Sequence, residues 1–137
     1  MQRRALLGIA ILIITLIVTA TTYATVPGDV RNDQTKYDNA LSASATMSID
    51  NGTASLKGRL TGKTGVTKIK CTLTLQKKES GNWNNVESWS KEVNATSITF
   101  TKTRSVSHGT YRTKAKFKVY KGGTCETITK YSSQATY

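Results

Sequence analysis

The amino-acid sequence predicts an all-β fold, an antiparallel sandwich of seven strands that follows an N-terminal signal helix. Apolar and polar residues alternate with a period of two in several segments after residue 40, which is the pattern of a strand with one buried face. These segments are short, are separated by residues typical of turns, and contain no helical periodicity. A closed barrel is the competing architecture.

The first 24 residues have the composition of a signal peptide. Arg3 and Arg4 give a positively charged start, and residues 5–20 form an uncharged apolar run. A membrane-spanning helix needs about 20 apolar residues. The run over residues 5–20 is shorter than this. It therefore predicts a signal peptide that is cleaved after Ala24, with Ala20 as the second choice and an uncleaved anchor as the alternative. We expect a secreted protein, free or retained at the cell surface, that meets the membrane only transiently through its signal peptide.

The remaining chain is basic and begins with a polar stretch. The sequence contains 20 Lys and Arg and 8 Asp and Glu, and removal of the two leader arginines leaves 18 basic residues against 8 acidic ones, a net charge of +10. Such a surplus attracts polyanions and is weakened by salt. Residues 25–40 are polar and without period, which predicts a flexible arm before a single domain over residues 41–137.

Seven segments of that domain are predicted to be strands. Alternation is clearest in residues 66–78 and 111–119, where every second side chain is apolar. Asn51 and Gly52 adopt positive φ at low cost, so the first two segments are expected to pair as a hairpin. The complete set of predicted strands is 41–49, 53–61, 66–78, 83–92, 96–103, 111–119 and 124–132.

Five short segments of the predicted domain carry a resemblance to known proteins: Thr72–Lys78, Trp83, Ser88–Ser90, Gly109–Arg112 and Lys118–Gly122. With them the chain resembles immunoglobulin-like or fibronectin type III-like sandwiches, and more closely a family of uncharacterised small secreted proteins of Gram-positive bacteria. The resemblance extends over about residues 41–133 and implies the fold and export, but no activity. It places Tyr111 where such folds have a tyrosine corner.

The two cysteines, Cys71 and Cys125, are not part of that family pattern. An oxidising compartment favours a disulfide between them, which would stabilise the fold by about 4 kcal/mol. In a fibronectin-like sheet, however, the sixth strand separates the third and seventh strands by about 9–10 Å, whereas a disulfide spans a Cα separation of up to about 7 Å. A disulfide and two buried thiols both remain open at this point.

A row of basic residues is predicted to point outward from the third and sixth strands, which are neighbours in an immunoglobulin-like sheet. Like charges that face each other across strands are destabilising. The cluster therefore indicates a site for an anionic polymer, such as wall teichoic acid or an acidic glycan, or else a solvated face that prevents sheet aggregation. No motif for specific nucleic-acid binding is present. The residues are Lys68, Lys70, Arg112, Lys114, Lys116 and Lys118.

Aromatic residues suggest a second kind of site. Trp83 and Trp89, together with Tyr120 or Tyr131, could stack against sugar rings, although one tryptophan at the centre of a sandwich is commonly core. We expect Trp89 to contribute to the core and Trp83 to lie at the rim. The sequence proposes no catalytic pair, and its single histidine, His108, is predicted to lie in an exposed turn.

Two cysteines far apart in sequence and one histidine do not form a zinc or haem motif. We therefore expect no metal site, no cofactor and no enzymatic activity. The predicted function is that of a secreted, non-enzymatic binding or structural module, held at an anionic cell envelope or glycan by its basic face. The alternative is a secreted effector or inhibitor that acts on another protein through its loops.

Overall fold

The computed structural model describes residues 36–137, which form eight β-strands; the predicted signal peptide 1–24 and residues 25–35 lie outside the described residues. Within the described part, no helix has the length and apolarity that a membrane crossing requires. The all-β class and the antiparallel pairing are confirmed. The strands are β1 (Ala40–Asp50), β2 (Thr53–Gly62), β3 (Val66–Glu79), β4 (Asn82–Val93), β5 (Ser97–Ser105), β6 (Thr110–Lys121), β7 (Thr124–Tyr131) and β8 (Ala135–Thr136).

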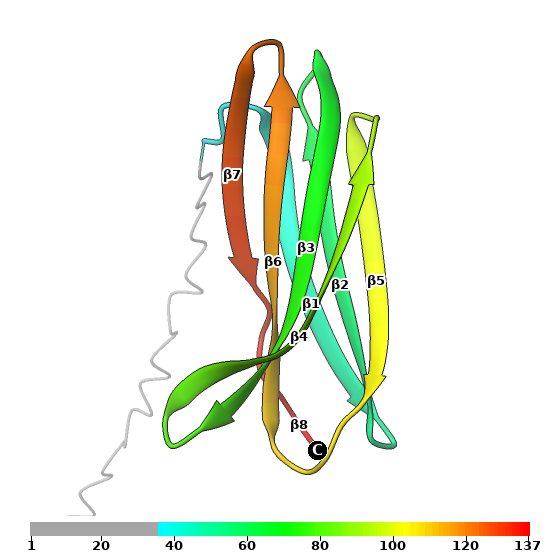
Figure 1. Cartoon of the computed structure of the whole chain (residues 1–137), viewed down its shortest axis with the longest axis vertical. Helices are drawn as coiled ribbons and strands as arrows, with labels where there is room; N and C mark the ends of the chain where they lie inside the picture. The colour runs from blue at the N-terminus through cyan, green and yellow to red at the C-terminus, as the bar shows by residue number, and fades with distance from the viewer. Residues whose placement is uncertain (1–35) are drawn as a thin grey trace, which may run out of the picture. The chain divides into compact units, whose positions relative to one another are not determined.

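The strands form two antiparallel sheets (Figure 1). The smaller sheet has the order β1-β2-β5, and its first two strands are joined by the predicted hairpin at Asn51 and Gly52, whose φ values are 46° and 74°. The larger sheet has the order β4-β3-β6-β7, and β8 pairs with β6. As expected, the third and sixth strands are direct neighbours, which places their outward side chains on one continuous face.

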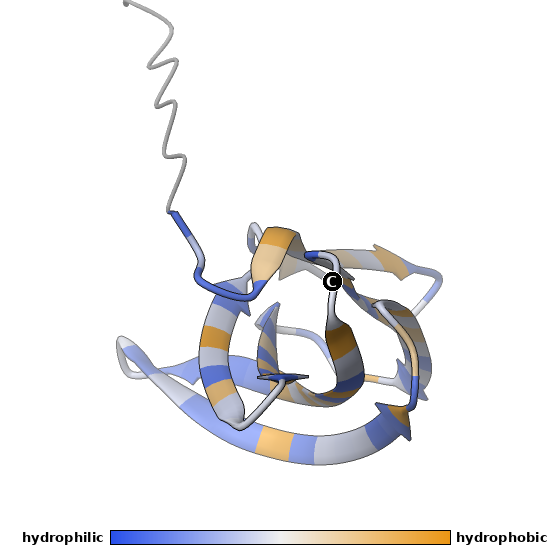
Figure 2. Ribbon diagram, turned by 90° about the horizontal axis from the view of Figure 1, so that it is seen from above, coloured by the Kyte–Doolittle hydropathy of each residue, from blue (hydrophilic) through white to orange (hydrophobic). Residues whose placement is uncertain are grey.

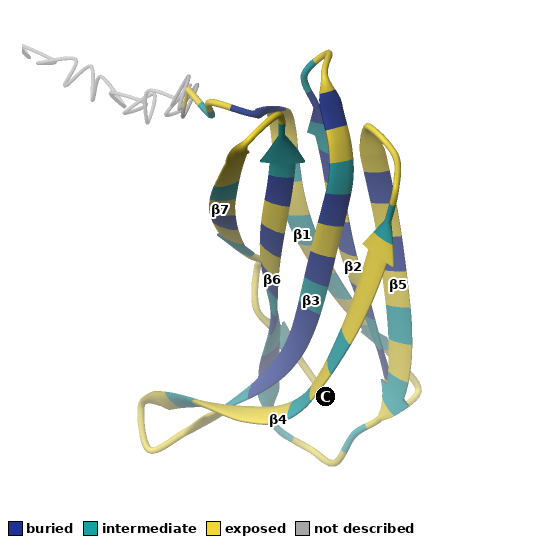
Figure 3. Ribbon diagram, turned by 45° about the horizontal axis from the view of Figure 1, so that its top comes forward, coloured by how far each residue is buried: buried dark blue, intermediate teal, exposed yellow. Residues whose placement is uncertain are grey.

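One hydrophobic core lies between the two sheets. Hydropathy alternates along the strands (Figure 2), and buried residues alternate with intermediate or exposed ones along β6 (Figure 3), as the pleat of a strand requires. Gly58 of β2 faces this core, where a Cβ atom would lie 2.9 Å from Cδ2 of Leu73. The largest fully buried side chains are Phe117, Leu56, Leu60, Ile69, Leu73, Leu75, Val119, Thr113 and Cys71.

Two details of the larger sheet are absent from the sequence prediction. The β3–β4 register shifts between Leu75 and Gln76, an irregularity of the kind that increases local twist, and the hairpin tip projects beyond the two sheets in Figures 1 and 3. The predicted count of seven strands omits β8, because two residues are too few to produce a periodic pattern. Tyr111 and Ala135 are register partners where β8 pairs with β6.

The residues just before β1 are held by β7. The carboxylate of Glu126 accepts hydrogen bonds from the backbone N–H groups of Asp38 (3.0 Å) and Asn39 (2.6 Å). The side-chain amide of Asn39 donates to the carbonyl oxygen of Val119 at 3.1 Å. These contacts tie residues 38 and 39, at the end of the predicted arm, to the larger sheet, and β1 begins at Ala40.

The outer face of the smaller sheet is covered by hydroxyl groups. Every outward position of β1 from Ser42 to Ser48 and every outward position of β5 carries Ser or Thr, and only Lys57 and Arg59 of β2 interrupt the array. The outward hydroxyl residues are Ser42, Ser44, Thr46, Ser48, Thr53, Ser55, Thr61, Ser97, Thr99, Thr101, Thr103 and Ser105.

Candidate functional site

The six predicted basic residues all lie on the outer face of the larger sheet, which we call the basic face. They alternate along β3 and β6 with buried side chains such as Ile69 and Phe117, so the pleat directs them away from the core. Lys70 and Lys118 are register partners on the two strands. The basic face comprises Lys68, Lys70, Arg112, Lys114, Lys116 and Lys118.

Little negative charge balances this face. Within residues 36–137, Lys68 is the only member with a carboxylate oxygen within 4.0 Å of its side-chain nitrogen, and its partner is Glu92 at 3.9 Å. The Lys68 ammonium also lies 4.4 Å from the ring centroid of Tyr120. The centre of the face is therefore a row of cations without counter-charges among the described residues.

Hydroxyl groups border the cations on the β4 side. The side-chain oxygens of Thr72 and Ser90 are 2.9 Å apart, and those of Thr74 and Ser88 are 2.7 Å apart. A shallow recess of about 190 Å³ is lined by Lys70, Thr72, Lys116 and Lys118. An anion in this recess would meet three ammonium groups and one hydroxyl group, all of which can donate hydrogen bonds to it.

At one end of the basic face, Arg112 is in contact with two aromatic rings. Its guanidinium carbon Cζ lies 4.3 Å from the ring centroid of Trp83 on β4 and 4.2 Å from that of Tyr131 on β7. Its Nε donates to Oε1 of Gln76 at 2.8 Å. Sequence reasoning missed this cluster, because its members come from four different strands whose registers no local pattern specifies.

The proposed sugar-stacking residues are not brought together. Trp89 is in register with buried Leu73 and packs against the core, which confirms the expected core contribution, whereas Trp83 lies on the opposite face of the sheet. Tyr120 is paired with Lys68 and Trp83 with Lys78, ten residues farther along β3. At about 3.3 Å per residue these register positions are about 33 Å apart. Trp83, Trp89 and Tyr120 therefore do not form one stacking surface.

The two cysteines are free, one buried and one exposed, an arrangement that differs from both alternatives left open by the sequence, a disulfide and two buried thiols. Cys71 of β3 is buried in the core, and burial raises its pKa from 9.0 to about 12. Cys125 of β7 is exposed, faces away from the core beside Tyr120, and raises the pKa of that tyrosine through a side-chain hydrogen bond. Strand β6 lies between the two cysteines, and they point to opposite faces of the sheet.

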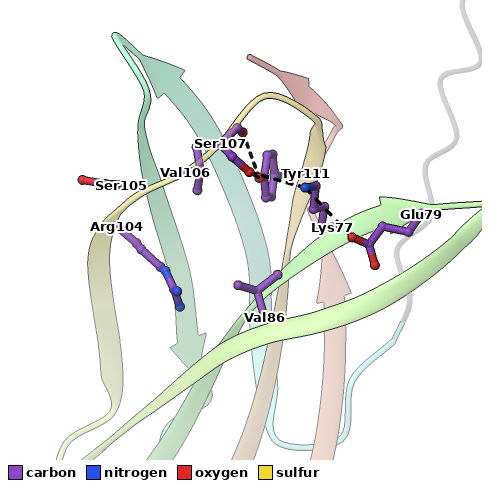
Figure 4. A pocket seen from close by; sticks show the side chains of 8 residues that line it. All are labelled: Lys77, Glu79, Val86, Arg104, Ser105, Val106, Ser107 and Tyr111. Atoms are coloured by element: carbon purple, nitrogen blue, oxygen red, sulfur yellow. Dashed lines mark hydrogen bonds and ion pairs between the residues drawn. The ribbon is translucent and has the colours of Figure 1, made fainter.

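A second recess, of about 260 Å³, lies where the β3–β4 hairpin meets the β5–β6 connection (Figure 4). Buried Tyr111 donates its hydroxyl hydrogen to the carbonyl oxygen of Ser107 at 2.9 Å. Lys77 reaches the Ser107 hydroxyl at 3.4 Å and Glu79 at 4.0 Å, and Arg104 forms an ion pair with Glu87. These polar groups largely form hydrogen bonds and ion pairs with one another. The recess therefore connects the strands and leaves few polar groups free to bind a ligand.

His108 lies in the exposed turn that the sequence predicts, where its ring stacks on that of Tyr137 with centroids 4.4 Å apart. In the part of the chain that the structure describes, no three His, Cys, Asp or Glu side chains are close enough to hold a metal ion.

Comparison of the chain with protein-family models, curated proteins and solved structures finds no match.

Proposed function

We propose that the protein is a secreted, non-enzymatic binding or structural module whose basic face holds it at an anionic polymer or glycan of the cell envelope. The observation that carries the proposal is the concentration of six cations on one sheet face, of which only Lys68 has a carboxylate partner among the described residues. Like charges in register, such as Lys70 and Lys118, oppose pairing of the strands. A bound polyanion would place negative charge beside these cations and so offset their mutual repulsion.

The finer fold assignment, an immunoglobulin-like or fibronectin type III-like sandwich, is part of the proposal. It is supported by the strand orders β1-β2-β5 and β4-β3-β6-β7, in which the chain passes repeatedly between the two sheets. The hydrogen bond from Tyr111, near the start of β6, to the backbone four residues upstream is a second supporting feature, since it has the geometry of a tyrosine corner.

Retention of the protein on purified cell walls over a series of salt concentrations tests the function. The informative variant is Lys116→Gln with Lys118→Gln, and its matched control is Lys57→Gln with Arg59→Gln. Both remove two exposed charges from a central strand, but from opposite sheets. We expect about a tenfold loss of retention for the first variant at moderate salt and almost none for the control.

Equal losses in the two variants would mean that only the net charge of the protein matters, and would refute a specific role for the basic face. Retention that does not depend on salt would exclude the electrostatic mechanism.

The alternative, an effector or inhibitor that acts through its loops, is favoured by the projecting β3–β4 hairpin. It predicts that both double variants keep full activity toward a protein target.

A further inference from the structure

Arg112 differs from the lysines of the basic face because its side chain is held in place. Trp83 reaches it from the β4 side and Tyr131 from the β7 side, with both ring centroids within 4.3 Å of Cζ. An arginine stacked on aromatic rings in this way has already lost most of its rotational freedom. Binding through such a side chain therefore costs less conformational entropy than binding through a free lysine.

A chain of amide groups sets the orientation of the guanidinium plane. Gln76 is 6 % exposed, and its Oε1 accepts the hydrogen bond from Nε of Arg112 at 2.8 Å. Its Nε2 donates to Oδ1 of Asn85 at 2.8 Å, which fixes the direction of the amide. These two hydrogen bonds join β4, β3 and β6 at the register shift between Leu75 and Gln76. At this point the outward side of β3 is also buried (Figure 3).

Most donors of Arg112 remain available. A guanidinium group has five N–H donors, and Nε supplies only the one taken by Gln76. Within residues 36–137, neither terminal nitrogen has a hydrogen-bond acceptor or a carboxylate partner. Their fork matches two oxygens of one oxyanion, in the bidentate geometry that lysine cannot provide.

The remaining cations continue from this position along β6. Lys114, Lys116 and Lys118 follow Arg112 at every second residue and on the same face. Successive positions are about 6.7 Å apart along the strand. A linear chain with its charges in the backbone, such as a phosphodiester polymer with short polyol spacers, can place successive charges along such a row. In an acidic glycan, by contrast, the carboxylates are substituents of bulky sugar rings and do not lie in the polymer backbone.

We propose that Arg112 is the fixed anchor for one phosphate group of a linear phosphodiester polymer that lies along β6, with the lysines binding the phosphates that follow. This inference rests on the proposed function and specifies the chemistry of its ligand. It assigns two distinct roles to the basic face. The lysine row provides salt-dependent attraction, and the Arg112 site, built by Gln76, Trp83 and Tyr131, provides an oriented contact that recognises phosphate.

Isothermal titration of the full protein with a synthetic glycerol-phosphate oligomer, and with poly-glutamate of equal charge as the carboxylate comparison, tests the anchor. Arg112→Lys keeps the charge but loses the fork and the stacking, and Arg59→Lys, the same exchange at an exposed position of the smaller sheet, is the matched control. We expect Arg112→Lys to weaken binding of the phosphate oligomer by about tenfold. Its salt dependence should be unchanged because the number of charges is the same. Arg59→Lys should bind as the wild type does.

Two further measurements guard against misfolding of the variant. Tyr131→Leu changes a half-exposed ring at the sheet edge and should weaken phosphate binding by a few-fold with an unchanged circular dichroism spectrum. In the wild-type protein, the NMR signal of the Arg112 Nε–H group should shift on addition of the phosphate oligomer, whereas that of Arg59 on the other sheet should not.

Equal phosphate affinity of Arg112→Lys and the wild type would overturn the anchor and leave the proposed function intact. An equal loss toward the phosphate oligomer and poly-glutamate would overturn the assignment of phosphate. Absence of binding to both polymers and to cell walls would refute the proposed function itself.

Discussion

Replacement of Lys118 by Gln should stabilise the fold, although it removes a residue of the proposed binding face. Lys118 is directly opposite Lys70 and lies two residues from Lys116 on the same face, and none of the three has a carboxylate partner among the described residues. At a charge separation of about 7 Å in water, each like-charge pair costs about 0.6 kcal/mol before screening. Screening at 0.15 M salt lowers this to about 0.25 kcal/mol for each pair.

The two neighbours together give a stabilisation of about 0.5 kcal/mol at physiological salt and about 0.9 kcal/mol near 0.02 M salt. The first value corresponds to a rise of about 2–4 °C in Tm for a domain of this size. Urea unfolding at both salt concentrations measures the effect. Lys57→Gln is the comparison: its register partners on the neighbouring strands, Thr46 and Thr101, are uncharged, and only Arg59, two residues away on the same face, repels it, so its gain should be about half as large.

The reasoning would be refuted if Lys118→Gln were destabilising, or if its gain in stability were the same at low and high salt. A variant that gains stability and loses polymer binding would show that the lysine row lowers the stability of the fold and serves binding. Such a trade-off is expected of a site that needs its like charges close together.

Four other perturbations test the fold and the thiols. Gly58→Ala would place a Cβ atom 3.2 Å from Sγ of Cys71 and 2.9 Å from the nearest leucine methyl carbon, so overpacking should lower the free energy of unfolding by about 1–3 kcal/mol. Gly123→Ala, with no atom within 4 Å of its Cβ, should be nearly neutral in the same urea titration, and equal effects would contradict the packing argument. Tyr111→Phe should cost about 1 kcal/mol because the hydrogen bond to the carbonyl four residues upstream is lost; an unchanged unfolding midpoint would show that this bond adds nothing. At pH 8 a thiol reagent should label Cys125 alone in the native protein and both cysteines in urea, and a native protein with no reactive thiol would indicate a disulfide. Burial raises the pKa of Cys71 from 9.0 to about 12, so the folded protein keeps this thiol neutral at a pH where the unfolded chain ionises it. The stability that the neutral, buried thiol contributes is therefore complete below pH 9 and should be lost as the pH rises toward 12.

Alternation in the sequence predicts strands and faces well, because the pleat fixes which side chains share a side. The outward placement of Lys114, Lys116 and Lys118 follows directly from the buried residues between them. The same rule applied to Ile128, which is buried, places Cys125 three positions earlier on the opposite face. The alternation therefore already placed Cys71 and Cys125 on opposite faces of the sheet, which argues against a disulfide between them.

Register and long-range clusters could not be predicted in this way. Pairing of β3 with β4 shifts between Leu75 and Gln76, and no local pattern marks this position. The surroundings of Arg112 depend on that shift and on partners from β4 and β7. Alternation specifies the side of the sheet on which a residue lies, whereas its neighbours across the sheet depend on strand order and register, which are set by contacts distant in sequence.

The hydroxyl array on the smaller sheet has a consequence for any surface that the protein covers. Molecules that lay with their lysine side on a charged polymer would present a dense layer of Ser and Thr side chains to the medium. Such a layer is well hydrated and has almost no charge, so it has little attraction for the lysine side of another copy. Adsorption would then stop after a single layer, and the covered surface would change from anionic to nearly neutral.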